Sequence, residues 1–334
     1  MSQAIRLQPM MRHLTGLMTL EAADMRGLLT LAKTLPARSD AGSLLAGRII
    51  ANLFFEDSTR TRTSFSVAAH RLGANVVNLS GAESSLSKGE TLVDTARNIE
   101  AMGVDALVVR AKQSGAAETI AKAVACSVIN AGDGRHEHPT QGLLDAFTLA
   151  MHLKRDGTWD LSGLRVAIVG DIVSSRVARS NIACLTALGA KVVCIGPPGM
   201  APAAITGASK VAGACEVSHD LDAELERIDA AMMLRIQFER HGAAPAAESH
   251  NPLRDGPKGG SLASVREYRS LYALTPERAA QMKPGAVVMH PGPINRGIEL
   301  DASVADGPRS LILAQVAHGV SVRMAVLARC VLGL

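Results

Sequence analysis

Short apolar segments alternate with longer amphipathic segments along this chain, and this alternation restricts its fold more than any other feature. The short segments lie at residues 49–55, 76–79, 106–109, 128–130, 166–169, 192–195, 230–234 and 287–290. Amphipathic helical patterns, such as residues 91–102 and 116–125, fill the gaps between them. Strands that are apolar on both faces are typical of parallel sheets covered by helices on both sides. We therefore predict an α/β fold.

The strands fall into two series, which indicates two doubly wound domains, each with a central parallel sheet covered by helices. A length of 334 residues is long for one core and suits two. The polar, turn-prone segment 154–163 separates the series. We predict a first domain at residues 1–153, a second at 154–304, and one long C-terminal helix at 311–331. Residues 241–260 are rich in Ala, Pro and Gly without periodicity and are expected to form a long loop.

The composition excludes several classes of protein. With 47% hydrophobic and 20% charged residues the chain is of the ordinary globular kind, and a net charge of +4 is too small to indicate nucleic-acid binding. The 5 cysteines include no Cys-x-x-Cys pair, so we expect reduced thiols in the core of a cytoplasmic protein. The sequence has neither an apolar run long enough to span a membrane nor the apolar region of a signal peptide. We predict binding neither to nucleic acid nor to membrane.

A dense pattern of hydroxyl and arginine side chains follows the first apolar strand. Ser58, Thr59, Arg60 and Thr61 lie where a polar turn leads into a predicted helix. Backbone N–H groups at a helix start attract anions, and hydroxyl and guanidinium groups add donors that suit phosphate. The alternative, a capped helix with solvated arginines, does not account for the alternation of hydroxyl and arginine. Because no Walker pattern occurs, we predict an oxyanion site of another kind.

Two further strand ends carry candidate donors. Arg110 follows the strand 106–109 and is expected to point into the crevice at the carboxyl edge of a parallel sheet, unless it is a surface arginine. His138 precedes a helix that starts with proline and can donate to a carbonyl oxygen, while Gln141 can bond an amide. On its own, His138 is equally compatible with a helix-capping or core histidine.

The Ser-Thr-Arg-Thr pattern of residues 58–61 and the His-Pro-Thr-Gln pattern of residues 138–141 resemble the transcarbamoylase family of aspartate and ornithine carbamoyltransferases. The resemblance covers nearly the whole chain. It implies that carbamoyl phosphate is bound by Ser58, Thr59, Arg60, Thr61, Arg110, His138, Gln141, Gly292 and Pro293. It implies that the catalytic residues are Arg60, Thr61, Arg110 and His138.

Two more features follow from this resemblance. The turn His290-Pro291-Gly292-Pro293 matches the family's turn whose backbone carbonyls hold the carbamoyl nitrogen, with Gly292 where leucine is common. The C-terminal segment, about residues 305–334, matches a helix that returns to complete the first domain.

Arginines at two strand ends of the second domain predict the acceptor. Arg176 and Arg235 can each clamp one carboxylate, as a dicarboxylic amino acid requires. With Gln237, these positions resemble the family's aspartate site, whereas ornithine enzymes carry a Ser-Met-Gly motif there and a later His-Cys-Leu-Pro turn. The resemblance therefore implies carbamoyl transfer from carbamoyl phosphate to L-aspartate, a step of de novo pyrimidine biosynthesis. The sequence carries no metal or cofactor motif, so we expect neither.

Residues 84–91 resemble the family's loop that reaches into a neighbouring subunit. The segment is rich in Ser, Gly and Lys, and a solvated turn is the simpler interpretation. The resemblance puts Ser84 and Lys88 in the adjacent subunit's active site, with Lys88 also contacting aspartate. It implies a homotrimer with shared active sites. Whether regulatory chains or a dihydroorotase join a larger assembly is left open.

Alternative functions differ from this one in what they require. A carbamoyltransferase for ornithine would need a carboxylate for the cationic side chain rather than Arg235. A catalytically silent homologue that acts as a scaffold would need neither Arg110 nor His138. Residues 169–176 follow a strand as in a nicotinamide dehydrogenase, but the Gly-x-Gly-x-x-Gly pattern is absent.

Overall fold

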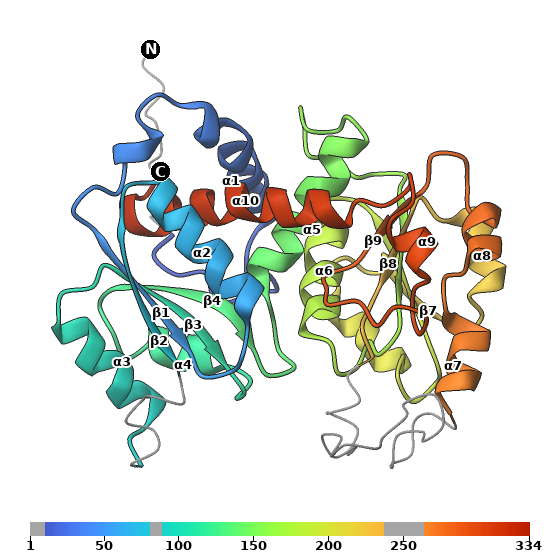
Figure 1. The fold of residues 1–334 in the computed structure, drawn as a ribbon, viewed down its shortest axis with the longest axis horizontal. Coiled ribbons are helices and arrows are strands. Elements are labelled where there is room, and N and C mark those ends of the chain that lie inside the picture. The colour runs from blue at the N-terminus through green and yellow to red at the C-terminus, as the bar shows by residue number, and fades with distance from the viewer. Residues whose placement is uncertain (1–10, 81–88, 237–263) are drawn as a thin grey trace. The chain divides into compact units, whose positions relative to one another are not determined.

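A computed structural model describes residues 11–80, 89–236 and 264–334 of the chain (Figure 1). The chain divides into two compact units, Met1–Thr140 with Gly319–Leu334, and Gln141–His318. These divisions fall inside two helices, α5 (Pro139–His152) and α10 (Ile312–Leu332). The predicted domain boundary at residues 153–154 stays a prediction.

The first unit contains a 4-stranded parallel sheet with the strand order β2-β1-β3-β4. Its strands are β1 (Ile49–Phe54), β2 (Asn75–Ser80), β3 (Ala106–Ala111) and β4 (Ser127–Asp133). Its helices are α1 (Ala22–Thr34), α2 (Thr59–Arg71), α3 (Leu92–Ala101) and α4 (Ala116–Ala121), with short 3-10 turns at Leu35–Ala37 and Ala41–Ser43. All of β4 is buried, as expected for a strand covered on both faces.

Most of α10, from Gly319 onward, belongs to the first unit. Near its end, Ser127 Oγ donates to the carbonyl oxygen of Cys330 at 2.7 Å. Closer to its middle, Arg323 Nη1 donates to Ser64 Oγ at 3.0 Å, and the guanidinium lies 5.2 Å from the centre of the Phe65 ring. The predicted return of the C-terminal helix to the first domain is confirmed.

The second unit contains a 5-stranded parallel sheet with the strand order β7-β6-β5-β8-β9. Its strands are β5 (Arg165–Val169), β6 (Lys191–Ile195), β7 (Cys215–Ser218), β8 (Ala230–Met233) and β9 (Val287–Met289). Besides α5 and α10, its helices are α6 (Arg176–Ala187), α7 (Val265–Tyr272), α8 (Pro276–Gln281) and α9 (Ala302–Ala305), with 3-10 turns at Ala203–Ala208 and Asp222–Arg227. Its core joins strand side chains to the fully buried Tyr268 of α7.

The predicted fold class is confirmed, with two exceptions in detail. Strand β7 was not predicted, because only its first residue is buried and the strand is short. The helix predicted at residues 116–125 ends at Ala121, so that prediction was wrong at its C-terminus. The backbone N–H groups of Ala125 and Cys126 instead donate to the Glu100 carboxylate, where the chain turns into β4.

The cysteines are free thiols, as predicted; Cys126 is half-buried and the other four are buried. Across the described ranges, no helix combines the length and the apolar character needed to cross a membrane.

Candidate active site

In each sheet the chain changes the side on which it adds strands. In the first unit, β1 lies between β2 and β3; in the second, β5 lies between β6 and β8. Parallel α/β sheets bind ligands outside the carboxyl ends of the strands at such a switch point. Of the predicted site residues, 58–61 follow β1, Arg110 lies near the end of β3, and the two acceptor arginines follow β5 and β8. The others that the structure describes follow β4 and β9.

The start of α2 forms the first part of the site. Ser58 is its N-cap residue, and the Ser58 hydroxyl makes no capping hydrogen bond within the described chain. Helical bonding begins with Arg62 N donating to Ser58 O at 3.2 Å, and the first turn contains no acidic residue. Arg60 is exposed, whereas Thr61 is buried with 9% of its surface exposed. Residues 58–61 therefore carry backbone N–H groups, hydroxyls and a guanidinium at one helix start, as an anion site requires.

Arg110 lies on β3 beside this helix start. It is paired with Phe54, the last residue of β1, and its carbonyl oxygen accepts the Phe55 N–H at 2.8 Å. Its guanidinium donates to the carbonyl oxygen of Ala131 at 3.2 Å and to Glu56 Oε1 at 3.3 Å. The arginine is half-buried and anchored at the carboxyl edge, so the alternative of a solvated surface arginine is wrong.

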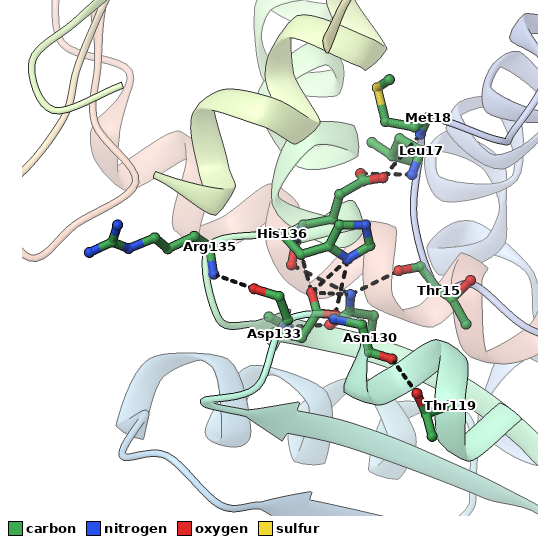
Figure 2. A network of polar contacts seen from close by, with 12 residues as sticks. Thr15, Leu17, Met18, Thr119, Asn130, Asp133, Arg135 and His136 are labelled. Atoms are coloured by element: carbon green, nitrogen blue, oxygen red, sulfur yellow. Dashed lines mark hydrogen bonds and ion pairs between the residues drawn. The ribbon is translucent and has the colours of Figure 1, made fainter. Parts of the chain in front are cut away.

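His138 ends the loop between β4 and α5, and a buried polar network holds this loop (Figure 2). The side chain of His138 is buried, with 4% exposed. Asp133 accepts hydrogen bonds from Gly115 N at 2.7 Å, Asn130 Nδ2 at 2.9 Å and Glu137 N at 3.1 Å. These hydrogen bonds tie the residues directly before His138 to β4 and to the start of α4.

Glu137 ties the same loop to the N-terminal segment. Its carboxylate accepts the backbone N–H groups of Leu17 at 2.8 Å and Met18 at 3.1 Å. Asn130 Nδ2 also donates to the carbonyl oxygen of Thr15 at 2.8 Å, a contact visible in Figure 2. Sequence reasoning missed these positioning residues; the polar side chains at the end of a buried strand were the only signal.

His136 lies at the rim of this network. Its Nδ1 lies 3.0 Å from Asp133 Oδ2, and the ring is partly exposed. The hydrogen bond to Asp133 raises the pKa of His136, while burial opposes the shift. The imidazolium form therefore strengthens the tie to Asp133.

The two predicted acceptor arginines follow the switch strands of the second unit. Arg176 is the first residue of α6 and is buried, with 7% exposed, next to the N-cap Ser175, whose hydroxyl accepts Ala178 N at 3.1 Å. Arg235 comes two residues after β8 and is half-buried. Gly170 has φ 132°, and a Cβ there would lie 3.0 Å from the Leu234 carbonyl oxygen. Glycine therefore allows the ends of β5 and β8 to approach closely.

Gln141 and the turn after β9 are held by hydrogen bonds within the second unit. Gln141 Nε2 donates to Asp145 Oδ1 at 2.8 Å, and Asp145 also accepts from Asn181 Nδ2 and Gln315 Nε2, both at 2.7 Å. Gly292 has φ 68°, a region that favours glycine.

Some predicted residues lie outside the described ranges. These are Ser84, Lys88, Gln237 and the predicted loop 241–260. Among the residues that are described, no group of three or more His, Cys, Asp or Glu side chains is arranged to hold a metal ion.

Comparisons with known proteins agree on one family. Residues 12–151 match the aspartate/ornithine carbamoyltransferase carbamoyl-P binding domain, and residues 162–330 match the Asp/Orn binding domain of the same family. The aspartate carbamoyltransferase catalytic subunit of Myxococcus xanthus is 53% identical over 321 residues, which cover 96% of this chain and 99% of that protein. The catalytic subunit of Gluconacetobacter diazotrophicus is 50% identical, covering 95% and 92%.

Solved structures with either acceptor resemble this one. Aspartate transcarbamoylase from Trypanosoma cruzi, in complex with carbamoyl phosphate and aspartate, gives a TM-score of 0.79 at 29% identity, covering 95% of each chain. Ornithine carbamoyltransferase from Pyrococcus furiosus gives 0.78 at 29% identity, covering 97% of this chain and 98% of that one. The fold alone therefore does not distinguish the two acceptors.

Proposed function

The chain belongs to the aspartate/ornithine carbamoyltransferase family, and we propose that it transfers the carbamoyl group of carbamoyl phosphate to the amino group of L-aspartate. The products are N-carbamoyl-L-aspartate and phosphate, and the reaction is a step of pyrimidine biosynthesis. The observation that carries the proposal is that strand ends at both switch points bear the groups this reaction needs. Oxyanion donors lie after β1 and at the end of β3, and arginines suited to a dicarboxylate follow β5 and β8.

The phosphate of the donor substrate is assigned to the start of α2. Ser58, Thr59 and Arg60 supply hydroxyl, backbone N–H and guanidinium donors, and the helix dipole favours the anion. The exposure of Arg60 suits a group that must reach a diffusing ligand. Arg60 offsets the charge that grows on phosphate as it leaves.

The carbonyl oxygen of the carbamoyl group is assigned to Thr61, Arg110 and His138. Attack by the aspartate amine forms a tetrahedral intermediate with negative charge on this oxygen. Fixed donors at such an oxygen are each worth about 2.7–4 kcal/mol in the barrier. The anchoring of Arg110 and of the loop before His138 supports this role, because donors held in advance need no reorganisation during the reaction.

The carbamoyl amide is assigned to Gln141 and to the backbone carbonyls of Gly292 and Pro293. Because Gln141 Nε2 donates to Asp145, its carbonyl oxygen is the atom that can accept an N–H of the carbamoyl group. All three protein groups are then acceptors, as an NH₂ group requires.

The acceptor L-aspartate is assigned to Arg176 and Arg235, with Lys88 and Gln237 from the undescribed segments. Two guanidinium groups match two carboxylates, whereas the ammonium of ornithine would be repelled. The departing phosphate, as the nearest base in this scheme, takes the proton of the attacking amine.

The assembly belongs to the same proposal. By the resemblance of its sequence, the chain forms a cytoplasmic homotrimer in which Ser84 and Lys88 complete the neighbouring subunit's site. The high identity to catalytic subunits along nearly their whole length supports a shared mode of assembly. Molar mass in solution, measured by light scattering, tests the trimer.

Phosphate release from carbamoyl phosphate, with L-aspartate or L-ornithine as the acceptor, tests the function. We expect release with aspartate and none above background with ornithine. Release with ornithine alone would assign the chain to the other branch of the family. A folded protein without release in either case would support the silent scaffold.

A further inference from the structure

A carboxylate with no role in the reaction scheme is completely buried beside the turn after β9. The Glu299 side chain has 0% of its surface exposed. Its Oε1 accepts Asn295 N at 2.6 Å and lies 3.2 Å from His290 Nε2, while its Oε2 has no hydrogen-bond partner among the described residues. Burying a carboxylate that is only partly satisfied opposes folding. The burial of Glu299 at this cost in folding free energy therefore calls for a functional explanation.

The contact with His290 transmits the position of Glu299 to the Gly292–Pro293 turn. Gly292 N donates to His290 Nδ1 at 2.7 Å, so Nδ1 is an acceptor and the ring proton is on Nε2. That proton is then donated to Glu299 Oε1. Glu299 thus fixes the tautomer and the orientation of the ring that holds the Gly292 N–H.

The contact with Asn295 transmits the position of Glu299 to the end of β8. The Asn295 side chain donates from Nδ2 to the Ile236 carbonyl oxygen at 3.3 Å, and its Oδ1 accepts Arg235 Nε at 3.5 Å. Asn295 therefore braces the residues that carry the proposed acceptor arginine.

Glu299 is itself held rigidly. Its carbonyl oxygen accepts Leu274 N at 3.0 Å, and Leu300 next to it forms a β-bridge with Leu274. His290 is fixed independently, because its N–H donates to Gln315 Oε1 at 2.9 Å. A rigid carboxylate between two functional segments can set the distance between them.

We propose that Glu299 is a positioning residue that holds the Gly292–Pro293 turn, through His290, and Arg235, through Asn295, in their working geometry. This inference rests on the proposed function, since it assumes that the turn and Arg235 contact substrates. Glu299 itself touches neither substrate.

Kinetics of Glu299→Met and Glu299→Gln test the inference. Methionine keeps the volume without an acceptor, and glutamine keeps one acceptor oxygen. We expect Glu299→Met to raise the KM for aspartate and to lower kcat, each by about tenfold. The Kd of carbamoyl phosphate without aspartate should rise less than the aspartate KM, because the turn loosens its hold on the carbamoyl amide while the phosphate donors at the start of α2 are untouched. Glu299→Gln should restore part of both losses.

Two comparisons separate positioning from plain destabilisation. Glu224 is a buried carboxylate in the same unit, paired with Arg165 at 2.8 Å, and Glu224→Gln should lower the unfolding midpoint without changing the aspartate KM. Asn295→Ala should raise the aspartate KM, and the double variant with Glu299→Met should raise it no further, because both changes release the same brace.

The outcomes distinguish this inference from the proposed function. If the wild-type protein releases no phosphate with aspartate, the proposed function fails. If the wild type is active but folded Glu299→Met has unchanged kcat and aspartate KM, the positioning role is overturned. Should Glu299→Met not fold, Glu299→Gln and Asn295→Ala decide: wild-type kinetics in both reject the role.

Discussion

Replacing Asp133 by asparagine probes the network that holds the loop before His138. The carboxylate is buried, with 1% exposed, and each oxygen is used: Oδ1 accepts from Asn130 Nδ2 and Glu137 N, and Oδ2 accepts from Gly115 N and contacts His136 Nδ1. An amide nitrogen in either position would face a backbone N–H donor, that of Glu137 or that of Gly115.

The size of the effect follows from this geometry. A buried donor that loses its acceptor costs about 1–3 kcal/mol, so the free energy of unfolding should fall by about that amount. Complete loss of one oxyanion donor lowers kcat by about 10²–10³, and this is the upper limit for His138. Because His138 is retained and only its support loosens, we expect kcat to fall by about tenfold.

Urea unfolding and steady-state phosphate release measure the two effects. Asp40→Asn is the matched control in the same unit, because Asp40 forms an exposed ion pair with Arg38 and should matter little. A folded Asp133→Asn protein with wild-type kcat would refute the claim that Asp133 positions His138, even if its stability were reduced. An unchanged free energy of unfolding would refute the claim that both oxygens of Asp133 are needed as hydrogen-bond acceptors.

Further substitutions test other parts of the site. Arg60→Ala should lower kcat by at least about 10²-fold while the fold survives, and activity above about a tenth of wild type would contradict its role at phosphate. Arg235→Ala should raise the aspartate KM far more than the Kd of carbamoyl phosphate; equal weakening of both would remove it from the acceptor site. Mixing inactive Lys88→Ala and Arg60→Ala proteins, after dissociation and reassembly, should restore activity, unless sites are not shared between subunits. Because the pKa of His136 is raised in the folded state, its contribution to stability is complete below about pH 6.5, the unfolded value, and disappears as the pH rises through the folded pKa. The difference in urea midpoint between wild type and His136→Ala should therefore shrink over that pH range. A difference that stays constant with pH would contradict the ion pair with Asp133.

Local patterns predicted the elements but not the contacts between distant segments. Strands such as β1 and β5 were predictable because a strand buried on both faces requires an apolar run. An edge strand such as β7, with one buried residue, leaves no such run. Arg110 could be placed at a strand end, since its position depends on the strand alone. The bonds of Glu137 to Leu17 and Met18 join residues about 120 positions apart, and no local pattern encodes them.

The choice of acceptor also has one part that a local sequence pattern predicts and one part that depends on contacts between distant segments. Aspartate and ornithine enzymes share this fold, so the sheet and its switch points provide a crevice but not its charge. In the proposed function, Arg235, two residues after β8, supplies that charge, and sequence alone predicts it. Its Nε donates to Asn295 Oδ1 at 3.5 Å, and Asn295 N donates to the buried Glu299 carboxylate at 2.6 Å. A variant that keeps Arg235 but loses this brace would keep the preference for a dicarboxylate and lose affinity for it. Under the two proposals, specificity by charge and affinity by geometry reside in different residues, and only the first could be read from the order of amino acids.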